Sequence, residues 1–476
     1  MKKMINVLCL AMILHSSSFA QNRSMQLDSL FSYYNENGMF NGIVLAAENG
    51  KVVYKKAVGF SDFENKILLD TSSVFSIGSV TKPFTAVAIM MLKEKGLLSY
   101  EDKLTDYFPA FQDYAKTITI RHLLTHTSGL IDFINDLKLL EIVPDLTDKI
   151  GLDSLINQPA LKFETGKKYS YCNSGYFLLA LIIEKVSGKT YREFIEENIL
   201  RPLGMKHTYI LDETMTNIPN RINSYKFFWE KSDDDLHLKA NGNGNMYSTV
   251  DDLLLFDQAL YGDKLLHQET LREAYDTTGL PQGGSFVYGF GWKIQADSTG
   301  DIVSHNGAIA GFRAHLWRDL HNRNTLIVLA NNTWLSQSPD ILSAADNIMQ
   351  GKSYQLGKIM VSEPFMENWY FRGFDAAMQK MCAILESDSS RYDFSSDCLN
   401  DLGYYFLNRN QVSEAISIFE FAIKLHPNND NLWDSLGETY MKAGNKAQAI
   451  KNYKKALELN PDLETAKSAL QKLEME

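Results

Sequence analysis

Ser79 and Lys82 are the residues whose types and spacing first suggest covalent chemistry. They open an apolar run that ends at Gly96, and Pro83 fits there because backbone N–H groups in the first turn of a helix have no partners within the helix. A spacing of i to i+3 places both side chains on one helix face. Because burial can lower a lysine pKa from about 10.4 toward neutrality, the pair predicts a serine nucleophile with a lysine base.

A Ser-x-x-Lys pair also occurs by chance in a chain of this length, so its setting decides its weight. Two further motifs follow it, Tyr171-Cys172-Asn173 and His305-Asn306-Gly307. Three accompanying segments read FSIG at 75–78, HTSGL at 126–130 and YGFGW at 288–292. Together these motifs resemble the serine β-lactamase and penicillin-binding protein family, in the branch that holds class C enzymes, D-stereospecific peptidases and related esterases. The resemblance covers about residues 25–350.

The resemblance implies a role for each matching residue. Ser79 matches the acylated nucleophile and Lys82 matches its base. Tyr171 matches the phenol that relays a proton to the leaving group and back from water. Asn173 matches the amide that binds the substrate's side-chain carbonyl and positions Lys82. A phenol of pKa about 10 can do acid–base work beside a cation that stabilises its anion. The alternative for Tyr171 is a core aromatic residue.

The third motif departs from the Lys-Thr-Gly that β-lactamases of this group usually carry. The resemblance implies that His305, Asn306 and Gly307 form a substrate-binding strand edge, and that glycine lets substrate approach the backbone. The N–H groups of Ser79 and Ala308 would form the oxyanion hole. Histidine in the first position is more similar to the D-peptidases and esterases, which argues against efficient β-lactam hydrolysis. The alternative for His305 is a packed or surface residue.

Other residues near these motifs have simpler interpretations. His126 lies in a Thr-Ser-Gly turn, where local hydrogen bonding is the expected role. Cys172 lies between two motif residues, but no activating histidine stands beside it in sequence, so we interpret it as a small filler. The segment 245–252 resembles a family loop that caps a helix through Ser248 or Thr249.

The elements that must position these residues are strands at the two ends of a long segment, with helices between them. Gly42–Ala47 and Lys51–Val58 form a hairpin through Asn-Gly, and a second hairpin follows far downstream. Its strands are Ala314–Arg318 and Thr325–Ala330, with Asp301–His305 before them. This order predicts an α/β (α+β) domain, an antiparallel sheet flanked by helices with an inserted helical subdomain, closed by a helix that ends at Gly351.

A repeat marks the C-terminal region. Seven positions agree between two copies that lie 34 residues apart, five with the same residue and two with another aromatic residue. They are Leu402, Gly403, Phe406, Ala415, Phe419, Ala422 and Pro427, which match Leu436, Gly437, Tyr440, Ala449, Tyr453, Ala456 and Pro461. This period resembles the tetratricopeptide repeat, with copies at about 396–429 and 430–463. We expect an all-α region over 374–476, a linker over 352–373, and an extra helix near Phe374–Glu386 because two repeats alone leave an open end.

Composition and the N-terminal segment indicate which partners and which cellular location to expect. The 476 residues carry 47 Lys and Arg against 58 Asp and Glu, a formal charge of -11, which argues against nucleic acid as a partner. Residues 1–20 have the pattern of a signal peptide, with Lys2 and Lys3 before an apolar stretch and a small-residue cleavage site. The hydrolase domain would then span 21–351. We expect the mature protein to be periplasmic or secreted. We expect no membrane span, cofactor or metal, and at most one disulfide.

Three functions remain open from the sequence. The preferred one is an exported serine acyl hydrolase that forms a covalent acyl-enzyme on amides or esters, most consistent with D-amino-acid peptides, penicillin binding or esterase activity. The second is a β-lactamase. The third is a binding or scaffold protein in which the repeat array recruits a protein or peptide partner and the hydrolase domain is weakly active.

Overall fold

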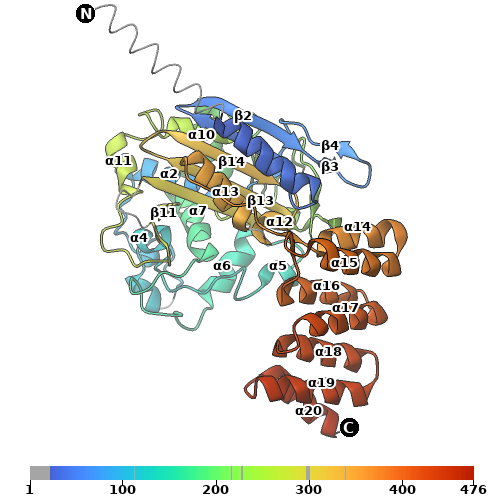
Figure 1. The fold of residues 1–476 in the computed structure, drawn as a ribbon. Helices are drawn as coiled ribbons and strands as arrows, with labels where there is room; N and C mark the ends of the chain where they lie inside the picture. The colour runs from blue at the N-terminus through green and yellow to red at the C-terminus, as the bar shows by residue number, and fades with distance from the viewer. Residues whose placement is uncertain are drawn as a thin grey trace, which may run out of the picture. The chain divides into compact units, whose positions relative to one another are not determined.

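The computed structural model describes residues 22–475 except residues 112, 216, 227–228, 296–300 and 338. The chain divides into two compact units, the first ending at Leu356 and the second beginning at Gly357 (Figure 1). The signal peptide predicted over residues 1–20 lies outside the described residues.

A seven-stranded antiparallel sheet forms the centre of the first unit, and its strands come from both ends of that unit (Figure 1). In order across the sheet they are β10 (Phe286–Tyr288), β11 (Lys293–Gln295), β12 (Ile302–Ile309), β13 (Phe312–Asp319), β14 (Asn324–Ala330), β1 (Gly42–Glu48) and β2 (Lys51–Val58). The two predicted hairpins are neighbours because β1 pairs with β14 along its whole length. The sheet predicted from the two termini is therefore confirmed.

The turn between β1 and β2 has the conformation that its sequence requires. Asn49 and Gly50 have φ angles of 48° and 75°. A two-residue turn with both φ angles positive matches the twist of antiparallel strands, and asparagine followed by glycine adopts it at the lowest cost. The Asn-Gly pair thus sets the register of the first hairpin.

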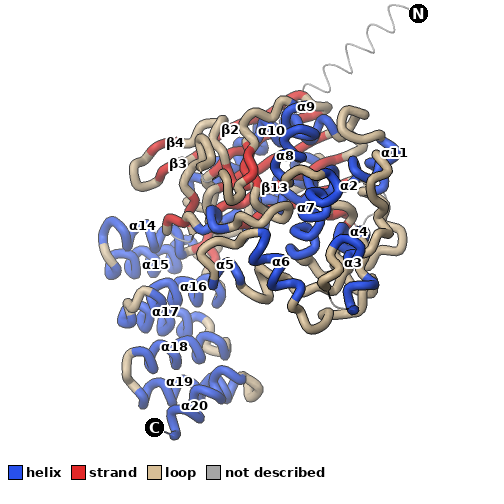
Figure 2. Tube along the Cα trace, turned by 180° about the vertical axis from the view of Figure 1, so that it is seen from behind, coloured by secondary structure: helices blue, strands red, loops and turns tan. Residues whose placement is uncertain are grey.

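Helices cover both faces of the sheet. A helix over residues 22–36 and α13 (Pro339–Met349) lie on the face seen in Figure 1, and α2 (Thr81–Glu94) and α10 (Val250–Ala259) lie on the opposite face seen in Figure 2. Among the helices inserted between the two hairpins, α7 (Asn173–Ser187) packs on α2. The others are α3 (Leu104–Tyr107), α4 (Ile120–Leu124), α5 (Leu139–Ile142), α6 (Asp148–Ile156), α8 (Tyr191–Ile195), α9 (Arg201–Leu203) and α11 (Gln268–Glu273). The short helix α12 (Trp334–Gln337) follows β14 and precedes α13.

Short strands complete the first unit. One three-stranded sheet has the order β5 (Phe75–Ser76), β9 (Met246–Ser248) and β6 (Tyr209–Ile210). Two-stranded sheets join β3 (Phe60–Asp62) to β4 (Ile67–Leu68) and β7 (Ser224–Tyr225) to β8 (Lys231–Ser232). Because β5 ends just before the turn that carries Ser79, its pairing with β9 fixes the approach of the chain to that turn.

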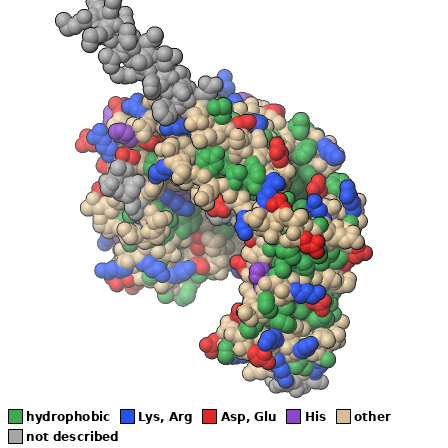
Figure 3. Space-filling model, viewed as in Figure 1, with side chains coloured by type: hydrophobic (Ala, Val, Ile, Leu, Met, Phe, Trp, Pro, Cys, Tyr) green, Lys and Arg blue, Asp and Glu red, His purple; other side chains and the backbone are tan. Residues whose placement is uncertain are grey.

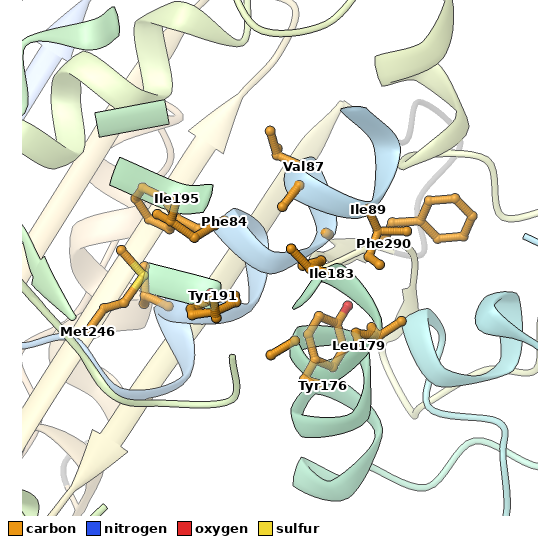
Figure 4. Close-up of a cluster of buried hydrophobic side chains, with 14 of the residues drawn as sticks. Phe84, Val87, Ile89, Tyr176, Leu179, Ile183, Tyr191, Ile195, Met246 and Phe290 are labelled. Carbon is orange, nitrogen blue, oxygen red and sulfur yellow. The ribbon is translucent and has the colours of Figure 1, made fainter. Parts of the chain in front are cut away.

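The main core lies between the sheet and the inserted helices. Phe84 of α2 stacks on Phe256 of α10 with ring centroids 3.8 Å apart. Tyr176, Leu179 and Ile183 project from α7 into the same cluster (Figure 4). Each large apolar side chain buried in this way contributes about 1.5–3 kcal/mol to stability. The core therefore holds α2 and α7, whose first residues carry the predicted site, in a fixed arrangement.

The second unit is a series of helical pairs. They are α14 (Ser362–Arg372) with α15 (Phe374–Asp388), α16 (Ser396–Asn408) with α17 (Val412–Leu425), and α18 (Asp430–Lys442) with α19 (Lys446–Leu459), followed by α20 (Glu464–Met475). Gly403 faces Phe419 and Gly437 faces Tyr453 at equivalent places in the two repeats. A Cβ atom at either glycine would lie within 3 Å of the ring, so the repeated glycine permits close packing of each pair.

The segment expected to be a linker differs from that expectation. Within residues 352–373 the structure has β15 (Ile359–Met360), which pairs in parallel with β16 (Tyr392–Asp393), and helix α14. Pro364 lies in the first turn of α14, where a helix tolerates proline. The sequence signal was weak because few apolar residues mark the buried face of this helix, chiefly Phe365 and Met366. Helix α15 is the extra helix expected near 374–386.

Charges of both signs are interspersed over the face of the molecule shown in Figure 3. Among the residues that the structure describes, no helix has the length and apolar character needed to cross a membrane.

Candidate active site

The turn that carries Ser79 is pressed against strand β12. The turn is a short 3-10 helix, Gly78–Val80, which runs directly into α2. A Cβ atom on Gly78 would lie 2.9 Å from the amide nitrogen of Ala308, and one on Gly307 would lie 1.9 Å from the carbonyl oxygen of Ile77. Both glycines are therefore required for the close approach, which brings the backbone of Ser79 beside that of Ala308, as the predicted oxyanion hole needs.

Lys82 lies one turn after Ser79 and is fully buried. Its Nζ atom is 3.0 Å from Ser79 Oγ, 2.9 Å from Asn173 Oδ1 and 2.7 Å from the carbonyl oxygen of Asn243. Two of these acceptors can take hydrogen bonds from a neutral amine while its lone pair faces the serine hydroxyl. The structure thus brings together the predicted Ser79, Lys82 and Asn173.

Burial controls the charge of this lysine. It lowers the pKa of Lys82 from 10.5 to about 7, against the opposing effect of the Asp132 carboxylate. An amine with a pKa near 7 is neutral in a large fraction of molecules at neutral pH. It can therefore accept a proton from the alcohol beside it.

Tyr171 lies on the other side of this pair. The Lys82 Nζ atom is 4.8 Å from the centroid of the Tyr171 ring. Burial raises the pKa of the Tyr171 phenol well above 10, and a hydrogen bond with Ser79 opposes that shift. The phenol is therefore protonated in the resting protein and is placed to give a proton to a group bound at Ser79.

His305 faces the site from β12, but both its ring nitrogens are occupied. Nε2 is 2.8 Å from the hydroxyl of Tyr288, and Nδ1 is 2.8 Å from the carbonyl oxygen of Asn306. Since a carbonyl only accepts, Nδ1 carries the hydrogen and Nε2 accepts from Tyr288. Burial lowers the pKa of His305 well below 6.5, with Lys82 adding to the effect, so the imidazole is neutral. In this state the ring shapes the site and fixes Tyr288.

The side chain of Asn306 does not join the group around Ser79. Successive residues of a strand point to opposite faces, so Asn306 projects away from the face that His305 occupies. Its Oδ1 is 2.7 Å from Nδ1 of His315, whose Nε2 is 2.9 Å from a carboxylate oxygen of Asp346 in α13. The side chain of Asn306 is thus held by His315 of β13 and does not contact Ser79 or Lys82.

His126 holds the Tyr171 segment by two hydrogen bonds. Its carbonyl accepts from the N–H of Ser170 at 2.9 Å, and its Nδ1 accepts from the N–H of Cys172 at 3.1 Å. The ring is 4.3 Å from the ring of Tyr171. The backbone of His126 has a φ of 56°, a strained conformation for a histidine. The role is in hydrogen bonding, as expected, but these bonds join His126 to a distant segment of the chain and not to its own turn.

Cys172 agrees with its interpretation as a filler. It is buried, and burial raises the pKa of its thiol to about 12, which leaves no reactive thiolate. Cys172, Cys382 and Cys398 are all free. Within the described part of the chain, no group of three His, Cys, Asp or Glu side chains could hold a metal ion.

Sequence reasoning missed two groups of the site. The Asn243 carbonyl contacts Lys82, and the Asp132 carboxylate accepts hydrogen bonds from the backbone N–H and Nδ2 of Asn173 at 2.8 and 3.0 Å. The available signal was the run Ala240–Asn245, in which Gly242 and Gly244 flank Asn243 and permit a close backbone approach. In the same region, Thr249 caps α10 as expected, accepting from the N–H of Asp252.

A serine and a buried lysine at the start of a core helix, between an antiparallel sheet and inserted helices, define a serine hydrolase. Comparison with known proteins gives the same class. The Beta-lactamase family model matches residues 27–342, and a tetratricopeptide repeat model matches residues 435–463. A penicillin-binding protein of Bacillus subtilis is 36% identical over 362 residues, which are 71% of this chain and 78% of that protein.

Solved structures agree in fold. A penicillin-binding protein homologue from Pyrococcus abyssi superposes with a TM-score of 0.63 at 25% identity, covering 69% of this chain and 77% of the other. A D-amino acid amidase from Ochrobactrum anthropi superposes with a TM-score of 0.61 at 22% identity, covering 69% and 99%. The chain belongs to the β-lactamase family of serine hydrolases.

Proposed function

We propose that this protein is an exported acyl hydrolase that works through a covalent ester on Ser79. The observation that carries the proposal is the position of the Lys82 amine, 3.0 Å from the Ser79 hydroxyl and fully buried. Export is supported by the basic start and apolar stretch of residues 1–20. The substrate class is amides and esters. D-amino-acid peptides are preferred because a relative that is 36% identical to this chain is a penicillin-binding protein.

Acylation follows from the positions of these groups. Lys82 takes the proton of the Ser79 hydroxyl as the oxygen attacks the substrate carbonyl carbon. The N–H groups of Ser79 and Ala308 hold the developing oxyanion, a role supported by the close approach of the turn to β12 at Gly78 and Gly307. Tyr171 gives its phenolic proton to the leaving amine or alcohol as the tetrahedral intermediate collapses. The phenolate regains a proton from Lys82, which returns the amine to its neutral form.

Deacylation uses the same groups in reverse. A water molecule loses a proton to the neutral Lys82 amine, directly or through Tyr171, which then passes its own proton to the amine, and attacks the ester carbonyl. The protonated Lys82 returns that proton to the Ser79 oxygen as it leaves, which restores the hydroxyl and the neutral amine. Asn173 stays bound to Lys82 and offers its amide edge to the acyl part of the substrate. The speed of this second half separates a penicillin-binding enzyme, which remains acylated by β-lactams, from a β-lactamase.

Covalent labelling tests the proposal. The chain is incubated with a fluorescent penicillin and, separately, with a fluorophosphonate, and the labelled peptide is identified by mass spectrometry. We expect label on Ser79 with at least one reagent and none in the Ser79→Ala variant. Folded protein that takes no label from either reagent would contradict the proposal.

Turnover assays then assign the substrate class. D-amino-acid peptides, short-chain esters and a chromogenic cephalosporin are compared, with Ser79→Ala as the control. We expect hydrolysis of the peptides or esters and slow, stoichiometric acylation by the cephalosporin. Sustained cephalosporin turnover would instead favour a β-lactamase.

A further inference from the structure

Asp132 is a buried carboxylate behind the site, and every hydrogen bond that it makes is accepted from an N–H group. Its Oδ1 accepts from the backbone N–H groups of Ile134 and Asn135 at 2.9 and 3.0 Å. Its Oδ2 accepts from the N–H and Nδ2 of Asn173 at 2.8 and 3.0 Å, and from Nδ2 of Asn135 at 3.2 Å. Both oxygens must therefore be acceptors, which an ionised carboxylate provides and an amide does not.

These contacts determine which way the Asn173 amide points. Because Nδ2 donates to Asp132, Oδ1 is turned toward Lys82, 2.9 Å from its Nζ atom. The flipped amide would set its NH2 group against the lysine amine and its oxygen against the carboxylate. Both contacts would be repulsive in a buried site. Asp132 touches neither Ser79 nor the substrate, yet it selects the orientation of the Asn173 amide that binds Lys82.

The same carboxylate acts on Lys82 through space. Burial lowers the pKa of Lys82, and Asp132 is the first group that opposes this shift. The other groups facing the amine are neutral in the resting state: burial raises the pKa values of Tyr171, Tyr176 and Cys172, and it lowers those of His126 and His305. Asp132 is therefore the carboxylate that keeps this lysine basic enough to accept a proton.

We propose that Asp132 is a positioning residue of this enzyme, which orients the Asn173 amide toward Lys82 and supplies the negative charge that balances the lysine. The role rests on the proposed function, since it presumes that Lys82 serves Ser79 as the base. The contact spans 41 residues of sequence, from the loop after His126 to the start of α7.

The first experiment compares Asp132→Asn with Ser174→Ala in the full chain. Ser174 provides a matched control because its hydroxyl joins the same loop to α7, donating to the Ile131 carbonyl and accepting from the Phe133 N–H, without touching Asn173. We expect Asp132→Asn to lower the second-order rate of acylation by fluorescent penicillin about 10- to 100-fold, as misplacing a site group by a fraction of an ångström does. Ser174→Ala should lower the melting temperature but change the rate less than about threefold.

The second experiment is a double-mutant cycle with Asn173→Ala. If Asp132 acts through Asn173, then Asp132→Asn costs little further rate in the Asn173→Ala background. The pH profile gives an independent reading. Activity rises with pH as Lys82 loses its proton, and this rising part of the profile is its acid limb. Asp132→Asn removes a negative charge that favours the protonated lysine, so the acid limb should move to lower pH. Asp132→Glu keeps the charge and should leave the acid limb in place. If Asp132→Asn does not fold, Asp132→Glu still tests the positioning of Asn173, because its longer side chain displaces the carboxylate.

Three results would overturn the role. They are equal rate losses in Asp132→Asn and Ser174→Ala, additive losses in the double variant, or a pH profile of Asp132→Asn whose acid limb stays where it is in the unaltered chain. These results leave Ser79 labelling intact and so spare the proposed function. Failure of the unaltered chain to take label overturns the proposed function, and the positioning role with it.

Discussion

At the scale of single residues, the site depends on one amine that is kept uncharged by its surroundings. Lys82 has no exposed surface, and its three close neighbours are a hydroxyl, an amide oxygen and a backbone carbonyl oxygen. None of these neighbours carries a charge, so the cost of desolvation is only partly offset by the more distant Asp132.

The pH dependence of acylation follows from this balance. Because the pKa of Lys82 is about 7 and the neutral form is the base, the acylation rate should rise with pH and reach half its maximum near pH 7. The measurement is the second-order rate of labelling across the pH range. Lys82→Arg is the control, since an arginine stays charged, and it should lower the rate more than about 100-fold at every pH. A rate that falls as pH rises through 7 would contradict a lysine base.

At the scale of elements, the site lies where the turn before α2 contacts strand β12, and a glycine on each side permits that contact. The 3-10 turn before α2 touches β12 at Gly78 and Gly307, and this contact places the N–H groups that would bind an oxyanion. The geometry depends on the absence of side chains as much as on their presence.

Gly307→Ala tests that contact. The added Cβ would lie 1.9 Å from the Ile77 carbonyl oxygen, so the turn and the strand must separate. We expect a loss of about 1–3 kcal/mol in the free energy of unfolding and a marked fall in acylation. Gly262→Ala is the matched control, because a Cβ there meets nothing within 4 Å, and it should change neither quantity. Wild-type acylation in Gly307→Ala would show that the close contact is dispensable.

How much of this could be predicted depends on the range of the interaction. The hairpins, the helix at Ser79 and the helical repeats follow from periodicity and turn residues that lie close together in sequence. The contacts of Lys82 with Asn243 and of Asp132 with Asn173 join residues 161 and 41 positions apart. The flanking glycines are the only local signal at Asn243, and Asp132 has no local pattern that marks it. The sequence predicted a strand that ends at His305, whereas β12 continues to Ile309. Because side chains alternate along a strand, Asn306 then points to the face opposite His305.

At the scale of the whole molecule, chemistry and repeats belong to different units. The residues around Ser79 and the core that supports them all lie before Leu356, and the helical pairs lie after it. The first unit therefore contains its own core and the complete proposed site.

A chain that ends at Leu356 should retain acylation. We expect its rate with fluorescent penicillin to stay within about threefold of the full chain, because a domain with its own core can fold alone. The same truncation carrying Ser79→Ala should take no label. Loss of labelling in a truncated protein that keeps a cooperative thermal transition would mean that the second unit contributes to catalysis. Retained labelling together with loss of a bound peptide or protein would assign recognition to the repeats.

The three free cysteines have a consequence for where this protein can work. Among the residues that the structure describes, no disulfide contributes to the fold, which is held by non-covalent contacts. Its melting temperature should be the same with and without dithiothreitol, and the enzyme should remain folded in oxidising and reducing surroundings alike.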